Sequence, residues 1–305
     1  MKPITRKVIL SLTLILALLA TSVIGCPAKD TDTTDAPTIP PITTFVMDFD
    51  DFNADSEASP TSVDTAALVQ QADFSIGSDD LYSSGQYAAG SQANWNWAVW
   101  NVGIWSLFIA AGMLVPSAAF LESFNHTPQQ QPDYSWIWSY NVTAGGDVYS
   151  AELHGKFIDD YNGSDSSVRW DMYISKQGEY TDFLWYYGES NLPATEGFWI
   201  LKNNPTAQTD LVQIDWERDL AEGTYSITYT NIVPDGPENG GYISHGATTG
   251  DPYNRFYNIY NKGADNLTEI EWNSTTKEGR IQDARHFGNS DWHYWNESHQ
   301  NMAAA

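Results

Sequence analysis

Residues 136–142 read WIWSYNV, and every second one of them is a large apolar residue. Because successive side chains of a β-strand point to opposite faces, an apolar period of two indicates a half-buried strand. The same period recurs in residues 149–157 and 168–174. We therefore predict that a sheet begins at Trp136.

Further short apolar segments follow as far as residue 295, separated by turn-forming groups such as Asn162-Gly163 and Asp235-Gly236-Pro237. Such short links leave little room for crossover helices, so neighbouring strands should be antiparallel. A dozen or so strands in sequence should curl, since strongly twisted open sheets rarely exceed ~10 strands. We predict a mainly β fold, in which residues 136–295 form a large antiparallel meander sheet that makes an open or closed barrel.

The stretch before the sheet is the most apolar part of the chain after its first 25 residues. Residues 98–115 contain only two polar side chains, and this apolar stretch is long enough for a second membrane span. No Lys or Arg lies between Lys29 and Lys156, however, so the charge bias that orients a span is missing. We favour a buried helix inside a helical segment of about residues 63–124, packed on the concave face of the sheet, and keep the span as the alternative.

In outline, a curved antiparallel sheet with an apolar helix against it resembles the open half-barrel of the periplasmic lipoprotein carriers and their lipid-binding relatives. The resemblance is one of topology, and such a likeness says little about function by itself. An apolar helix beside a large sheet nevertheless makes a cavity between the two plausible. An apolar or amphipathic small molecule or lipid would be its ligand.

The N-terminus has the layout of a secretion signal. Basic residues precede an apolar run from Val8 to Ala20, which is shorter than the ~20 residues of a spanning helix. The sequence then reads Val23-Ile24-Gly25-Cys26, which resembles the lipobox of bacterial lipoproteins. That resemblance implies removal of signal peptide 1–25 and attachment of lipid, palmitate among its acyl chains, to Cys26, the only Cys of the chain.

Lipidation would place the protein in the cell envelope, with the lipid on Cys26 as its contact with the membrane. Pro27 follows the Cys where Asp would favour inner-membrane retention, so the resemblance implies the outer membrane, on its periplasmic or surface face, if the host is Gram-negative. Residues 26–44 are rich in Thr, Asp and Pro and predict a flexible tether. We expect residues 45–305 to form a single β-rich domain.

Charge and composition exclude several functions. The chain has 39 acidic and 14 basic side chains, and its formal charge of −25 repels nucleic acid. Its acidic clusters, at residues 48–55 and around Asn162-Gly163, do not match an EF-hand and are more simply solvated loops, so no metal site and no cofactor are expected.

Catalysis has little support in the sequence. Glu269 and Glu271 would share one face of a strand, and paired carboxylates can hydrolyse glycosides. No Gly-x-Ser-x-Gly nucleophile elbow occurs, and one carboxylate pair in so acidic a chain is weak support. We therefore expect a binding module without enzymatic activity.

Aromatic residues, 14% of the chain, are the candidate binding residues. They could line a cavity for an apolar ligand, form a sugar-binding platform, or fill the core of a structural envelope component with no ligand. We favour the cavity, and keep a carbohydrate-binding or carbohydrate-active surface protein and the structural component as alternatives. The predicted lining residues are Trp97, Trp100, Trp105, Phe108, Trp136, Trp138, Trp170 and Trp185.

Overall fold

The computed structural model describes residues 35–47, 90–159 and 165–302, and the described residues from Pro37 onward belong to one compact unit. The expected acidic cluster at residues 48–55, and most of the one around Asn162-Gly163, lie outside the described residues. The described helices are η1 (Ile42–Thr44), α4 (Ala93–Ser123) and α5 (Ala284–Phe287). The described strands are β1 (Gln129–Gln130), β2 (Trp136–Ala144), β3 (Asp147–Asp159), β4 (Asp165–Lys176), β5 (Tyr180–Asn191), β6 (Glu196–Asn204), β7 (Ala207–Asp219), β8 (Thr224–Asn231), β9 (Tyr242–Ala247), β10 (Arg255–Asn261), β11 (Asn266–Trp272), β12 (Gly279–Asp283) and β13 (His293–Trp295).

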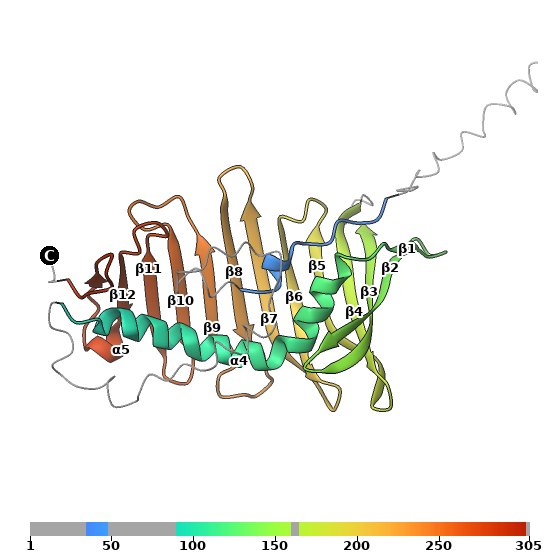
Figure 1. Ribbon diagram of the computed structural model, residues 1–305, viewed down its shortest axis with the longest axis horizontal. Helices are drawn as coiled ribbons and strands as arrows, with labels where there is room; N and C mark the ends of the chain where they lie inside the picture. The colour runs from blue at the N-terminus through green and yellow to red at the C-terminus, as the bar shows by residue number, and fades with distance from the viewer. Residues whose placement is uncertain (1–34, 48–89, 160–164, 303–305) are drawn as a thin grey trace, which may run out of the picture. The chain divides into compact units, whose positions relative to one another are not determined.

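All described strands belong to one antiparallel sheet of 13 strands, and each pairs with the next along the chain (Figure 1). This confirms the predicted meander. Its main part begins at Trp136 and ends at Trp295, and only the two-residue strand β1 precedes it. Among the described residues β1 and β13 do not pair, so the sheet stays open.

The strand register places bulky apolar side chains on one face, called here the inner face. Gly188 of β5 lies between Trp170 of β4 and Trp199 of β6. A Cβ atom at residue 188 would approach the Trp199 ring to 2.6 Å and the backbone oxygen of Phe198 to 2.1 Å. Glycine inside a strand weakens it, but here it provides the space that the Trp199 ring occupies.

Helix α4 crosses the strands on the inner face (Figure 1). Its 31 residues correspond to roughly 46 Å at ~1.5 Å per residue, which matches about ten strand spacings of ~4.8 Å. Near its N-terminus, Asn94 donates to the backbone oxygen of Tyr294 in β13 at 3.0 Å. Near its C-terminus, the hydroxyl of Tyr140 in β2 donates to the backbone oxygen of Ala119 at 2.6 Å. The helix therefore joins opposite ends of the sheet, as the predicted packing on that face requires.

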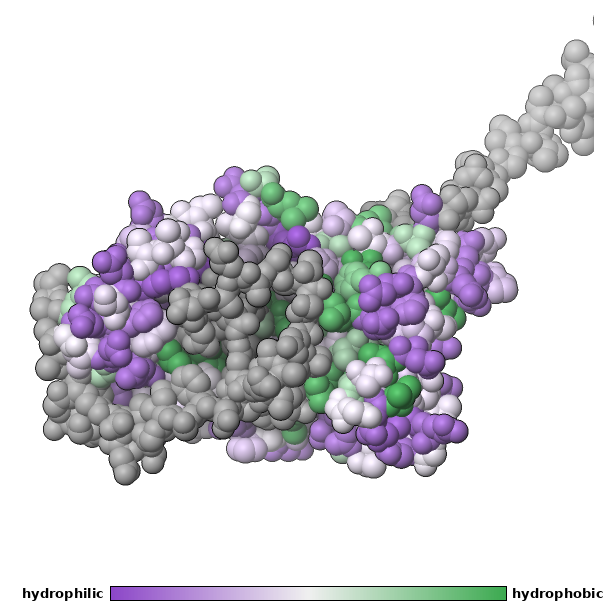
Figure 2. Space-filling model, viewed as in Figure 1, coloured by the Kyte–Doolittle hydropathy of each residue, from purple (hydrophilic) through white to green (hydrophobic). Residues whose placement is uncertain are grey.

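The helix bends in its C-terminal part (Figure 1). Pro116 lies inside it, and a proline both lacks the backbone N–H and crowds the preceding turn, which explains the bend. Hydrophobic residues gather over this part of the molecule, with hydrophilic residues beside them toward the first strands of the sheet (Figure 2). No helix among the described residues has both the length and the apolar character needed to cross a membrane.

A short N-terminal segment fills the centre of the inner face. Phe45 is fully buried, and its ring lies 4.9 Å from Phe120 of α4 and 4.6 Å from Tyr186 of β5. The Tyr229 hydroxyl donates to the backbone oxygen of Phe45 at 2.9 Å and accepts the backbone N–H of Met47 at 2.7 Å. Packing therefore begins before residue 45, because η1 belongs to the stretch expected as tether. Of the expected helical segment, residues 63–89 lie outside the described residues.

Candidate functional site

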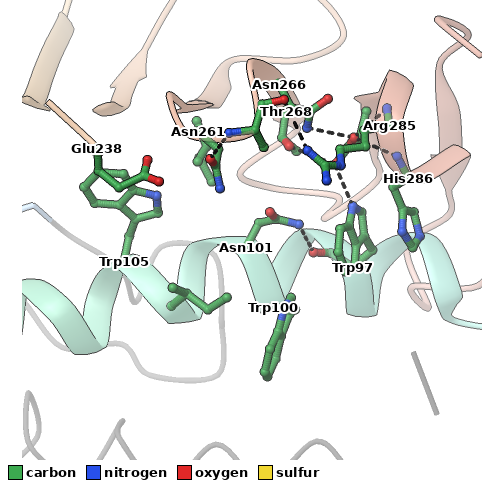
Figure 3. Close-up of a pocket in the computed structure, with 14 residues that line it drawn as sticks. Trp97, Trp100, Asn101, Trp105, Glu238, Asn261, Asn266, Thr268, Arg285 and His286 are labelled. Carbon is green, nitrogen blue, oxygen red and sulfur yellow. Dashed lines mark hydrogen bonds between the residues drawn. The ribbon is translucent and has the colours of Figure 1, made fainter. Parts of the chain in front are cut away.

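A cavity of about 710 Å³ lies between the N-terminal half of α4 and the ends of strands β10 to β12 (Figure 3). This volume falls within the ~300–1,000 Å³ typical of small-molecule sites. The lining residues are Trp97, Trp100, Asn101, Ile104, Trp105, Glu238, Ile259, Asn261, Ala264, Asn266, Thr268, Asp283, Arg285 and His286.

The helix wall of the cavity is mostly aromatic and aliphatic. Residues 97, 101 and 105 are four apart and therefore share one side of the helix. Trp97 and Trp105 point toward the strands, whereas Trp100 points to the opposite side of α4 (Figure 3). Ile104 is 49% exposed, which is high for a large apolar side chain. This wall thus offers apolar surface, at Ile104, that the described part of the chain leaves exposed.

Apart from Ile259 of β10, the strand wall is polar, unlike most of the inner face. Asn261 of β10 pairs with Asn266 of β11, and Thr268 of β11 pairs with Asp283 of β12. Further along the same face of β11, Ile270 is fully buried. The inner face therefore changes from apolar to hydrogen-bonding side chains where the strands meet the cavity.

Asp283 connects the two walls. Its side chain is 2% exposed, and donors from three parts of the chain surround it. Oδ2 accepts from Trp97 Nε1 (3.0 Å) and Thr268 Oγ1 (2.9 Å), and Oδ1 accepts from Asn266 Nδ2 (3.0 Å) and the backbone N–H groups of Arg285 (3.2 Å) and His286 (3.0 Å). The carboxylate therefore caps α5 and holds α4 against β11 and β12.

The ring of His286 lies flat on Trp97, with centroids 3.7 Å apart and planes 7° from parallel. Burial lowers the pKa of His286 below its usual value; nearby His293 adds to this and Asp283 opposes it. Since the usual value is about 6.5, the imidazole is mainly neutral at pH 7. It therefore acts here as a flat aromatic surface at one end of the cavity.

Three of the residues predicted from sequence belong to the lining: Trp97 and Trp105 on the side of α4 that faces the strands, and Trp100 on the other side of the helix. Phe108 belongs to α4, but its side chain is outside the described residues.

The other four predicted residues lie elsewhere. Trp136 and Trp138 belong to β2, Trp170 to β4 and Trp185 to β5, and each is at most 8% exposed. Trp138 and Trp170 pack together with ring centroids 5.9 Å apart. These four build the core at the opposite end of the sheet and do not line the cavity, because β2 to β5 lie far along the sheet from β10 to β12.

The polar residues of the strand wall were missed from the sequence. A signal for them exists, because in β11 the positions of Ile270, Thr268 and Asn266 share the inner face. A polar residue at a position whose parity is otherwise apolar indicates either an error or a site. Asp283 carries a second signal, since Asp before a short helix is a common N-cap.

The carboxylate pair considered for catalysis lies on the outer face. Arg280 Nε donates to Glu271 at 2.8 Å, and Glu269 pairs across the strands with Gln282. Glu271 therefore belongs to an ion pair away from the cavity. Among the described residues, no three His, Cys, Asp or Glu side chains are grouped so as to hold a metal ion. Comparisons with protein-family models, with curated proteins and with solved structures found no match to this chain.

Proposed function

We propose that this protein is a lipid-anchored binding protein of the cell envelope that holds an amphipathic ligand between α4 and strands β10 to β12. The anchor rests on the sequence around Cys26, which lies outside the described residues. The binding site rests on the geometry of the cavity. No chemical step is needed for this function.

The observation that carries the proposal is the contrast between the two walls. Trp105 and the half-exposed Ile104 offer apolar surface on the helix side, and Asn261 and Asn266 offer amide groups on the strand side. An apolar molecule would leave amide atoms of this wall that bond to no described residue, such as Asn266 Oδ1, without partners, at a cost in free energy. A fully polar molecule would leave the apolar wall in contact with water. A ligand with one apolar and one polar part satisfies both walls.

Carbohydrate binding is the second candidate, because indole rings and Asn side chains occur together in the lining. Asn101, Asn261 and Asn266 all take part in it. Sugars present hydroxyl groups to amides and flat C–H faces to aromatic rings. The two candidates differ in whether an alkyl chain contributes to binding.

Intrinsic Trp emission separates the two candidates. The chain from residue 26, carrying Cys26→Ser so that it needs no detergent, is titrated with dodecyl maltoside below its micelle concentration and, separately, with maltose. We expect the emission to shift with dodecyl maltoside alone. An equal response to maltose would favour the sugar-binding candidate.

A matched pair of variants locates the response. Trp105 lines the cavity, whereas Trp292 stacks on Arg280, with 4.2 Å from the guanidinium carbon to the ring centroid. Both side chains are half-buried. We expect Trp105→Phe to weaken dodecyl maltoside binding and Trp292→Phe to leave it unchanged. If both variants bind as the parent does, the ligand site is elsewhere.

A further inference from the structure

The charged groups that line the cavity are negative on balance. Asp283 and Glu238 supply carboxylates, and Arg285 supplies the guanidinium. Asp283 takes part in none of the ion pairs between described residues, and all its hydrogen-bond donors are neutral groups. Neutral donors stabilise a carboxylate without cancelling its charge, so a negative potential extends into the cavity.

The basic groups of the lining do not offset this potential inside the cavity. The side chain of Arg285 is exposed, and its Nη1 donates to the backbone oxygen of Ala264 at 3.2 Å. Water screens this charge and also that of Glu238, whose side chain is exposed too, so the buried Asp283 keeps the balance negative. The imidazole of His286 carries little charge at pH 7, because burial lowers its pKa.

One corner of the cavity combines a carboxylate with an indole ring. Glu238, from the loop after β8, and Trp105 of α4 both line the cavity, at the end away from His286 (Figure 3). The backbone N–H of Gly263 donates to Glu238 Oε2 at 3.2 Å. A Cβ atom at residue 263 would lie 2.3 Å from Glu238 Oε1, so the absence of a side chain there lets the carboxylate lie close to the turn. We call this pair the Trp105–Glu238 corner.

The geometry points to a ligand whose polar end is a positively charged nitrogen, held at the Trp105–Glu238 corner, with its hydrocarbon part against Ile104 and Ile259. This inference rests on the proposed function and specifies its ligand as a cationic amphiphile. A cation is attracted both to a carboxylate and to the face of an indole ring. The formal charge of −25 raises the local concentration of cations around the molecule and repels anions such as fatty acids.

Three amphiphiles that share a twelve-carbon chain test the inference: dodecyltrimethylammonium, dodecyl maltoside and dodecanoate. Each is titrated below its micelle concentration into the Cys26→Ser chain, and heat is measured. We expect the ammonium compound to bind at least ~10-fold more tightly than the maltoside, and dodecanoate to bind most weakly. Equal affinity for all three, or tighter binding of the maltoside or dodecanoate, would overturn the inference while leaving the proposed function intact. Binding of none of them would contradict the proposed function itself.

Two variants show whether the preference comes from the corner or from the net charge alone. Glu238→Gln removes the charge at the corner and keeps the size of the side chain. Glu222→Gln removes one charge from an exposed turn that does not line the cavity. We expect Glu238→Gln to remove most of the preference for the ammonium compound over the maltoside, and Glu222→Gln to keep it. If the two variants behave alike, a positively charged nitrogen is not bound at this corner.

Discussion

Replacing Asp283 with Asn should destabilise the fold although it changes hardly any volume. The amide of Asn has one oxygen, whereas donors reach both oxygens of the buried carboxylate. When the NH₂ group takes the place of Oδ2, the N–H of Trp97 points at another donor and loses its acceptor, because an indole N–H can only donate. The Thr268 hydroxyl loses the same acceptor, but it can rotate and accept a hydrogen bond from the NH₂ group. In the flipped orientation, two backbone N–H groups of α5 face the NH₂ group instead.

The first orientation is the cheaper one, and its cost can be worked out. One buried donor without a partner costs about 1–3 kcal/mol, and exchanging a charged acceptor for a neutral one weakens the remaining bonds by about 1 kcal/mol. We therefore expect Asp283→Asn to lower the free energy of unfolding by about 2–4 kcal/mol.

Urea unfolding followed by circular dichroism measures this change. Asp215→Asn is the control, because Asp215 is exposed on the outer face and bonds only to Gln213 among the described residues; it should change stability by less than ~0.5 kcal/mol. In Trp97→Phe the N–H donor is absent, so adding Asp283→Asn there should cost less than in the parent. Equal stability of Asp283→Asn and the parent would refute the role given to this carboxylate.

Three further predictions follow from other parts of the chain. Phe45→Ala removes a fully buried ring and should lower the free energy of unfolding, measured by heat or urea, by about 3–5 kcal/mol. Phe124→Ala, at a residue 43% exposed, should lower it far less, and similar losses would contradict the burial of Phe45. Burial lowers the pKa of both His286 and His293, so the unfolded chain binds protons more readily than the folded one. The free energy of unfolding that these two neutral side chains contribute should therefore be complete above pH ~6.5 and decrease below it, and the decrease should be smaller in His286→Gln. A urea midpoint that does not change with pH would argue against this. Cys26→Ser should release the protein from membranes washed in high salt; retention would mean that something other than lipid anchors it.

The sheet could be predicted from sequence because the alternation of apolar and polar residues within one strand indicates which of its faces is buried. The alternation that begins at Trp136 indicates which side chains of β2 face inward without information from any other strand. The short links between strands then favour antiparallel pairing of neighbours. The packing of α4 could be predicted as well, since a helix that is apolar on all sides is buried against other elements, here the sheet.

The position of the cavity could not be predicted in the same way, because it depends on contacts between distant parts of the chain. Trp97 and Asp283, which close one end of the cavity, are 186 residues apart. The centre of the inner face is filled by Phe45, which sequence analysis placed only at the start of the domain. Local periodicity shows which aromatic residues lie on an inward face, but the position of α4 along the sheet decides which of them line the cavity.

Mapping where a bound amphiphile lies tests the central claim most directly. A twelve-carbon ammonium amphiphile with a photoreactive diazirine at the end of its chain is irradiated with the Cys26→Ser chain, and mass spectrometry locates the labelled residues. The cavity predicts labels on Ile104 and Ile259, from both α4 and β10, and competition by unlabelled dodecyltrimethylammonium. Labels confined to outer-face residues such as Phe198 and Phe256, or labelling without competition, would contradict a ligand site between the helix and the sheet.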